Sequence, residues 1–129
     1  MTDRRSLSSG SPWEDRVGYS RATRVGPLVE LAGTVAADKN GVLHHGDAYA
    51  QSCYIIEKMH HYLLALGADY SNVVRTRMYL RHVDDWEEVT RAHAKYFSIV
   101  KPVSTLLVIK DLIDPEALVE IEMTAWVSE

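Results

Sequence analysis

Alternation between apolar and polar residues is clearest near the end of the chain, from Leu118 to Val127. Side chains point alternately to the two faces of a strand, so this pattern predicts a strand with one buried and one polar face. The segment Val73–Arg81 alternates in the same way. Three further strands are predicted between turn-forming residues, at Tyr19–Val25, Leu28–Val35 and Val103–Ile109.

Helical periodicity occurs in two places between these strands. One stripe follows Gly46-Asp47 and consists of Ser52, Ile55, Ile56, Met59, Leu63 and Leu66. A second helix is expected to start near Asp84. The order of elements predicts an α+β domain, with two helices packed on one face of a mixed sheet of about six strands.

The sheet face turned away from the helices is predicted to be mixed in character. Its acidic and large apolar residues would be Glu30, Glu120, Glu122, Tyr79, Leu106 and Trp126, accompanied by arginines. A solvated face rarely needs Trp and Leu, and a core does not tolerate so many charges. We therefore favour a subunit interface with polar clefts. The alternative is a solvated sheet face whose charges are paired.

Length and composition set the domain organisation and exclude several partner classes. The 129 residues suit one domain, which we place at residues 15–129, after a serine-rich segment, residues 1–14, that we read as a mobile tail. The net charge of −4 and the lack of a long apolar run argue against nucleic-acid and membrane partners. A single cysteine, Cys53, excludes an internal disulfide, and we expect a cytoplasmic protein.

Candidate chemistry is confined to a few residues. The histidines lack metal-site spacing, and the adjacent His60 and His61 diverge by about 100° on a helix, so we expect neither a metal nor a cofactor. Glu120 is the best candidate acid, because a carboxylate among apolar strand residues would have a raised pKa and would activate water. The alternative for Glu120 is an ion pair with Arg75 or Arg77.

Four segments together resemble the YjgF/Rid family, also called the endoribonuclease L-PSP-like family. They are GYSRA at 18–22, LVELAGTV at 28–35, VVRTRMYLRHV at 73–83 and the closing segment at 101–126, in which VEIE at 119–122 is the most specific run. The resemblance implies a chorismate-mutase-like fold. It also implies a homotrimer that binds small molecules in clefts between its subunits.

The resemblance further implies a reaction and a set of site residues. Family members hydrolyse reactive enamines and imines to a 2-keto acid and ammonia, and an arginine holds the substrate carboxylate. Tyr19, Gly33 and Glu120 match the family pattern. Ser104 stands where the family has that arginine, Leu106 where it has a cysteine, and Ala32 where it has a serine.

These departures shape the predicted function. Serine offers no charge and no bidentate fork, so we expect an imine, enamine or related substrate other than the usual 2-imino acids. Glu120 is the predicted catalytic residue, and the predicted substrate-binding residues are Tyr19, Ala32, Gly33, Ser104, Leu106 and Arg77. By strand alternation, Ala32, Ser104 and Glu120 are expected on one sheet face. A non-catalytic ligand-binding trimer stays open, as does, with less support, an endoribonuclease or translation inhibitor.

Overall fold

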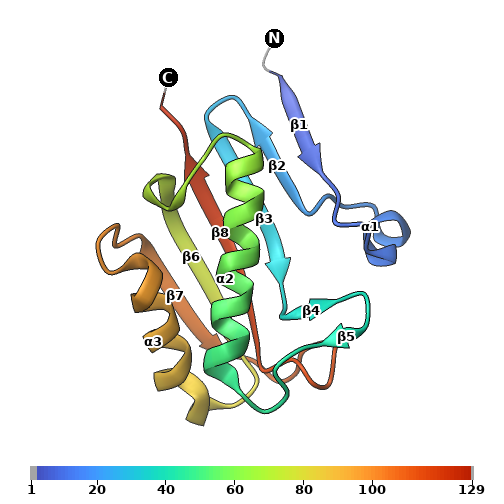
Figure 1. Cartoon of the computed structure of the whole chain (residues 1–129), viewed down its shortest axis with the longest axis vertical. Coiled ribbons are helices and arrows are strands. Elements are labelled where there is room, and N and C mark those ends of the chain that lie inside the picture. The colour runs from blue at the N-terminus through green and yellow to red at the C-terminus, as the bar shows by residue number, and fades with distance from the viewer. Residues whose placement is uncertain (1–2, 129) are drawn as a thin grey trace.

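The computed structural model describes residues 3–128 and places six strands in one mixed sheet, in the order β1-β2-β3-β8-β6-β7 (Figure 1). The strands are β1 (Arg4–Leu7), β2 (Ala22–Val25), β3 (Leu28–Thr34), β6 (Val73–Leu80), β7 (Val103–Val108) and β8 (Val119–Trp126). β6 and β7 are parallel, and the other neighbouring strands are antiparallel. A small ribbon of β4 (Ala37–Asp38) and β5 (Gly41–Val42) follows β3.

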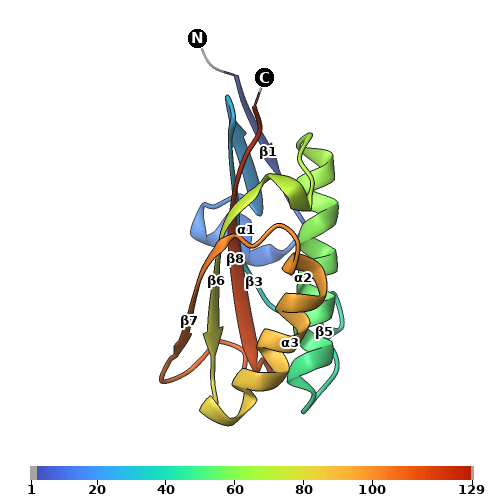
Figure 2. The same cartoon turned by 90° about the vertical axis from the view of Figure 1, so that its left-hand side faces the viewer.

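Two helices, α2 (Ala48–Ala65) and α3 (Trp86–Phe97), cover the same face of the sheet (Figure 2). This arrangement confirms the predicted α+β fold, including the two helices on one face. The short helix α1 (Pro12–Val17) lies near the β1 end of the sheet, away from α3. Two 3-10 turns, Tyr70–Asn72 and Val83–Asp85, precede β6 and α3. Across residues 3–128, no helix combines the length and apolar character that a bilayer crossing requires.

The core lies between α2 and the apolar face of β8. The predicted stripe of α2 is buried along its whole length, and so are the four apolar residues of β8 that face it, Val119, Ile121, Met123 and Ala125. Burying one such large side chain contributes about 1.5–3 kcal/mol. Asp47 caps α2 by accepting a hydrogen bond from the Ala50 amide, and Gly67, with φ of 79°, follows its end. The helix therefore begins and ends where the sequence predicts.

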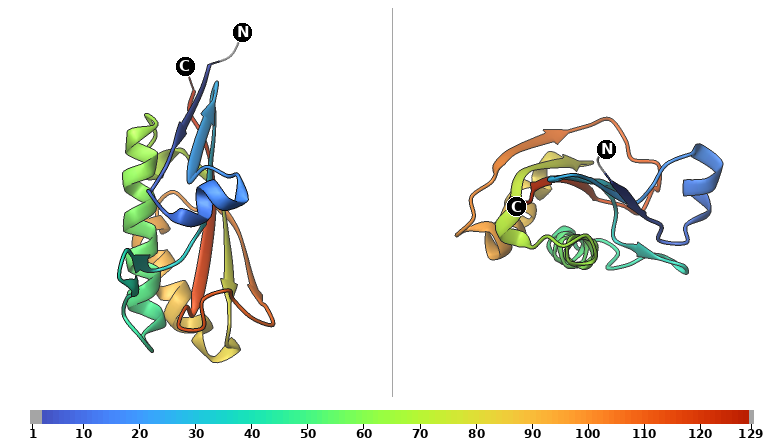
Figure 3. Two further views of the ribbon diagram at one scale, coloured as in Figure 1. Left: turned by 90° about the vertical axis from the view of Figure 1, so that its right-hand side faces the viewer. Right: turned by 90° about the horizontal axis from the view of Figure 1, so that it is seen from above.

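The N-terminal segment differs from the prediction of a mobile tail. Residues 4–7 form the edge strand β1, which pairs with β2 from Arg4↔Val25 to Leu7↔Ala22 (Figure 3). Ser11 then caps α1, and Gly18, with φ of 92°, ends it, so that β2 begins only at Ala22 and not at Tyr19. Backbone pairing and polar contacts hold this segment in place. Neither requires a periodic pattern of apolar residues, so nothing in the sequence indicated the strand.

Candidate functional site

The sheet surface opposite α2 and α3, here called the outer face, carries the predicted mixture of charged and large apolar side chains. Alternation along β8 places Glu120, Glu122, Thr124 and Trp126 on it, because the intervening residues are buried under the helices. Arg77 pairs with Glu122 across the strands, and Tyr79 pairs with Glu120. The outer face therefore presents carboxylates beside guanidinium and phenol groups.

A β-bulge shapes this face at the end of β3. The register runs from Leu31↔Met123 directly to Thr34↔Ile121, so Ala32 and Gly33 together oppose a single residue of β8. The extra residue turns Thr34 toward the helices, where it is 2 % exposed, whereas simple alternation predicted it on the outer face. Gly33, which simple alternation from the buried Val29 and Leu31 would place under the helices, turns instead toward Glu120.

Gly33 and Glu120 are in close contact. A Cβ at position 33 would overlap Oε2 of Glu120 and would lie 3.0 Å from its Cδ, so only glycine leaves the carboxyl group in its place. Burial raises the pKa of Glu120; the neighbouring Glu122 raises it further, while the positive charge of Arg21 lowers it. The predicted ion pair of Glu120 with Arg75 or Arg77 does not form among residues 3–128. Glu120 is therefore a carboxyl group suited to proton transfer.

The raised pKa has a consequence for stability. The native state binds the Glu120 proton more tightly than the unfolded chain does, so this group makes the free energy of unfolding fall as pH rises above the ordinary value of 4.5. We expect Glu120→Gln to raise the melting temperature at pH 7, and the gain to shrink at pH 4. Glu87→Gln, on an exposed position of α3, is the control for the change in net charge. A gain of equal size at both pH values would contradict a raised Glu120 pKa.

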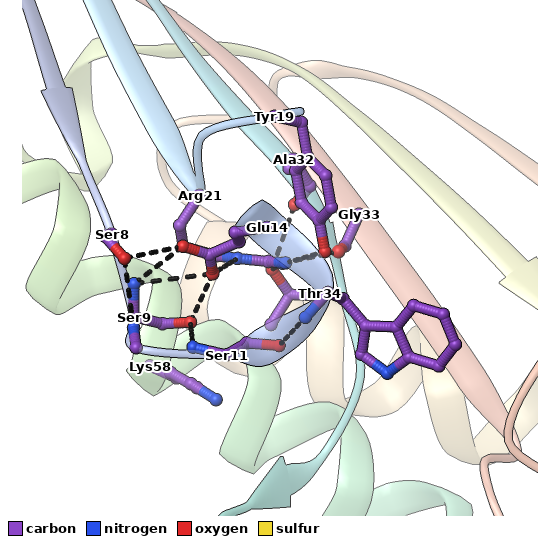
Figure 4. Close-up of polar contacts among 12 residues, drawn as sticks. Ser8, Ser9, Ser11, Glu14, Tyr19, Arg21, Ala32, Gly33, Thr34 and Lys58 are labelled. Carbon is purple, nitrogen blue, oxygen red and sulfur yellow. Dashed lines mark hydrogen bonds and ion pairs between the residues drawn. The ribbon is translucent and has the colours of Figure 1, made fainter. Parts of the chain in front are cut away.

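A buried ion pair supports the bulge from the side of α1 (Figure 4). Arg21 and Glu14 are 8 % and 3 % exposed, and Nε of Arg21 donates to Oε2 of Glu14 at 3.4 Å. The Nη1 group of Arg21 donates to the Gly33 carbonyl at 2.6 Å and to Oγ1 of Thr34 at 3.2 Å. Its Nη2 group donates to the Tyr19 hydroxyl at 2.9 Å, which leaves the hydroxyl's own proton free for another acceptor.

Glu14 is held in its ionised form by Ser8 and Ser9, which belong to the segment predicted to be a mobile tail. Burial by itself would raise its pKa, but hydrogen bonds from Ser9 and Ser8, and then the charge of Arg21, lower the pKa overall. The Ser8 hydroxyl donates at 2.8 Å and the Ser9 amide at 3.1 Å. Sequence analysis missed Glu14 and Arg21, because neither residue belongs to an amphipathic pattern.

The outer face is hollowed between α1 and the sheet, with a volume of about 690 Å³. The hollow is lined by residues of five strands, of α1 and of the loop after α1, among them Arg4, Tyr19, Glu30, Ala32, Arg77 and Glu122. Three predicted substrate-binding residues, Tyr19, Ala32 and Arg77, therefore line one hollow. Glu120 is not in its lining but lies next to it, two residues along β8 from Glu122 and against Gly33.

Ser104 lies on the opposite side of the sheet from Glu120, which corrects the expectation that the two share a face. Ser104 pairs with the fully buried Thr76, and Oγ1 of Thr76 donates to Oγ of Ser104 at 2.8 Å. The same Thr76 oxygen lies 2.8 Å from Nε2 of His93 in α3, whose pKa is lowered by burial. The expectation placed Ser104 on the wrong face of β7. In the structure, the parallel register with β6 sets Ser104 beside Thr76, which faces the helices, so Ser104 lies on the helix side as well.

Leu106 is turned toward the helix side as well. It pairs with the buried Met78 and packs against the core, so it does not belong to the outer face as predicted. Of the seven predicted site residues, the structure brings together Tyr19, Ala32, Gly33, Arg77 and Glu120. Among residues 3–128, no three histidine, cysteine or acidic side chains form a group able to hold a metal ion.

Comparison with known sequences points to one family. The sequence profile described as Endoribonuclease L-PSP matches residues 12–127. An uncharacterised protein of Streptomyces coelicolor is 38% identical over 122 residues, which cover 95% of this chain and 91% of that protein. The 3-aminoacrylate deaminase RutC of Acinetobacter baylyi is 31% identical over 110 residues, with 84% and 86% of the two chains covered.

Comparison with solved structures agrees with the sequence result. The crystal structure of a member of the YjgF/YER057c/UK114 family from Mycobacterium tuberculosis has a TM-score of 0.88 and 40% sequence identity. The match covers 97% of this chain and all of that chain. A protein of unknown function from Pseudomonas aeruginosa has a TM-score of 0.85 at 27% identity, with 99% and 95% of the two chains covered. The fold of this chain is thus the fold of these proteins.

Proposed function

This chain belongs to the endoribonuclease L-PSP family, also called the YjgF/YER057c/UK114 family, and from that premise we propose that it is a hydrolase that removes ammonia from a small imine or enamine. The observation that carries the proposal is the carboxyl group of Glu120, which has a raised pKa and lies against Gly33 beside a polar hollow. A carboxyl group with a raised pKa holds its proton more tightly than an exposed carboxylate does, which suits it to donating and accepting a proton in turn.

In the proposed reaction with an enamine, Glu120 donates a proton twice and accepts a proton twice. Protonated Glu120 donates its proton to the enamine carbon, and the nitrogen lone pair forms the C=N bond. The carboxylate then accepts a proton from water while the water oxygen bonds to the iminium carbon and the C=N π pair moves to nitrogen. In the last step Glu120 protonates the nitrogen, the C–N bond breaks, and the hydroxyl proton returns to Glu120 as the carbonyl forms.

Two further features support a deaminase over other activities of the family. The RutC relative is named for the deamination of 3-aminoacrylate, which is an enamine. The net charge of −4 disfavours the phosphate contacts on which binding to RNA depends. A ligand-binding protein without catalysis remains the alternative outcome. Turnover of imines and enamines by the wild-type protein distinguishes the two.

We also propose that the protein is a homotrimer whose subunits meet through the outer face. Leu28 and Trp126 lie opposite each other on β3 and β8 and are 38 % and 52 % exposed in the single chain. Val103 and Leu107 on the edge strand β7 are exposed as well. Large apolar side chains among charges are typical of subunit interfaces. A neighbouring subunit would also complete the open side of the hollow.

Assembly is tested by the molar mass in solution. Light scattering at micromolar concentration is expected to give three chains per particle, since a stable interface of this kind buries more than about 1,000 Å². Trp126→Asp is expected to shift the mass toward one chain, because it places an unpaired charge in an apolar contact. Trp86→Asp, on the exposed side of α3, is the matched control and should leave the mass unchanged. A wild-type mass of one chain would contradict the trimer.

A further inference from the structure

The side chain of Arg21 is used almost completely by the protein itself (Figure 4). Its guanidinium makes four hydrogen bonds, one each to Glu14, Gly33, Thr34 and Tyr19. A guanidinium has five N–H donors, so at most one is left, and the side chain is buried. Arg21 is therefore not a ligand-binding group. Its task concerns the groups that it joins, which come from α1, from the loop after α1 and from the bulge of β3.

The contact with Gly33 is the one that bears on the site. A β-bulge disrupts the regular hydrogen bonds between strands, and glycine has the most mobile backbone of all residues. The sheet by itself therefore holds the Gly33 peptide less firmly than its neighbours. Nη1 of Arg21 donates to the Gly33 carbonyl at 2.6 Å and fixes this peptide from outside the sheet. Because the Glu120 carboxyl lies against Gly33, a shift of the peptide changes the space that the carboxyl occupies.

Arg21 is in turn held by Glu14, and Glu14 is held by two serines. Glu14 is in ion-pair contact with Arg21, and both side chains are buried. The hydroxyls of Ser8 and Ser9 and the amide of Ser9 all donate to the Glu14 carboxylate. These two serines are exposed and lie between β1 and α1, outside the lining of the hollow. A line of direct contacts thus runs from the surface of the N-terminal segment to the bulge that Glu120 touches.

A buried ion pair is a weak means of stabilising a fold, since the loss of hydration offsets most of the attraction between the charges. The geometry that the pair imposes explains it better. We propose that Arg21 is a positioning residue for Glu120: it holds the bulge against which the carboxyl lies, and two surface serines keep it in place through Glu14. The expected loss of turnover rests on the proposed function, whereas the expected change in the position of the carboxyl does not.

Arg21→Lys separates positioning from charge. Lysine keeps a positive charge beside Glu14, but its donors all leave one nitrogen, so it lacks the fork that also reaches the Gly33 carbonyl. We expect kcat for 3-aminoacrylate to fall about 10- to 100-fold, the effect of misplacing a reacting group by about 1 Å, while KM changes by less than about threefold. Arg24→Lys is the matched control and should leave kcat unchanged, because Arg24 also donates to a backbone carbonyl, that of Leu66, but lies outside the hollow.

A milder double variant, Ser8→Ala with Ser9→Ala, tests the link to the N-terminal segment and covers the case in which the lysine variant does not fold. Both serines are exposed, so the double variant is expected to fold. It removes two hydroxyl donors from Glu14 and keeps the Ser9 amide. We expect kcat to fall by a smaller factor than in the lysine variant, with KM unchanged. Ser6→Ala is the control, because the Ser6 hydroxyl is hydrogen-bonded to Oγ1 of Thr23 at 2.8 Å and not to Glu14.

The position of the carboxyl is measured independently of turnover, by the NMR resonances of the Glu120 carboxyl carbon and the Gly33 carbonyl carbon. Both resonances should move in Arg21→Lys and in the double serine variant, and neither should move in Arg24→Lys or Ser6→Ala. Unmoved resonances in a folded variant, an unchanged kcat in either folded variant when the wild type is active, or equal changes in the controls would overturn the inference. If the resonances move as expected but the wild type hydrolyses no enamine, the proposed function fails and the positioning role stands.

Discussion

Glu120→Gln is expected to lower the turnover number for imine or enamine hydrolysis by about 10²- to 10⁴-fold, the usual contribution of a general acid–base group. Glutamine keeps the size and polarity of the side chain but can neither give up nor accept the proton that each step needs. Since Glu120 lies beside the hollow and not in its lining, KM should change little. The assay follows ammonia release above the spontaneous rate, with Glu87→Gln as the control.

Gly33→Ala tests the same role through geometry. The new Cβ would overlap the Glu120 carboxyl, which is the mobile end of a flexible side chain, so the carboxyl group moves and the backbone does not have to. We expect a folded protein with a melting temperature close to wild type and activity nearly as low as that of Glu120→Gln. If either variant keeps more than about a tenth of the wild-type rate, Glu120 is not the proton-transfer group.

The second large effect concerns substrates of the usual family type. The wild-type protein is expected to hydrolyse 2-iminopropionate about 10- to 150-fold less efficiently than a family member that has the arginine, because a hydrogen-bonded charge pair worth about 1.5–3 kcal/mol is absent. Ser104 carries no charge; its oxygen accepts from Thr76, and only its own O–H remains to donate. The imine is generated with an amino-acid oxidase, and the remaining imine is trapped with semicarbazide.

Two variants separate the reasons for low activity on 2-imino acids. Ser104→Arg places a guanidinium on an exposed position of the edge strand β7, on the side of the sheet away from Glu120 of the same chain, so it should restore activity only through the Glu120 of a neighbouring subunit in the proposed trimer. Arg77→Ala is the comparison for the other face, because Arg77 lies on the same side of the sheet as Glu120 and lines the hollow. Full wild-type activity on 2-iminopropionate that Arg77→Ala abolishes would show instead that Arg77 takes over the missing arginine's task.

Much of the fold follows from periodicity alone. Only one orientation of α2 buries its apolar stripe, and only one orientation of β8 buries its apolar face. In β8, a shift of one residue would expose every apolar side chain. The faces of β8 and β6 were therefore predictable, and with them the placement of Glu120, Glu122 and Arg77 on one surface. The family resemblance supplied Tyr19 and Gly33 as site residues.

The parts that sequence could not give depend on contacts without a repeating pattern. The bulge at Ala32 and Gly33 adds one residue to β3, and no apolar period marks it. Ser104 belongs to an edge strand that is exposed along most of its length, so its alternation does not reveal which side faces the helices. The Glu14–Arg21 pair depends on serines that, read by composition, resemble a tail.

The most direct test of the central claim is the rate at which 3-aminoacrylate disappears. The enamine is formed from malonate semialdehyde and ammonia, diluted into ammonia-free buffer, and followed by its ultraviolet absorbance. We expect the wild-type protein to accelerate the decay well above the spontaneous rate, and Glu120→Gln at equal concentration to leave it close to that rate. Decay at the spontaneous rate with folded wild-type protein, or equal acceleration by the wild type and Glu120→Gln, would contradict the assignment of Glu120 as the proton-transfer group of an enamine hydrolase.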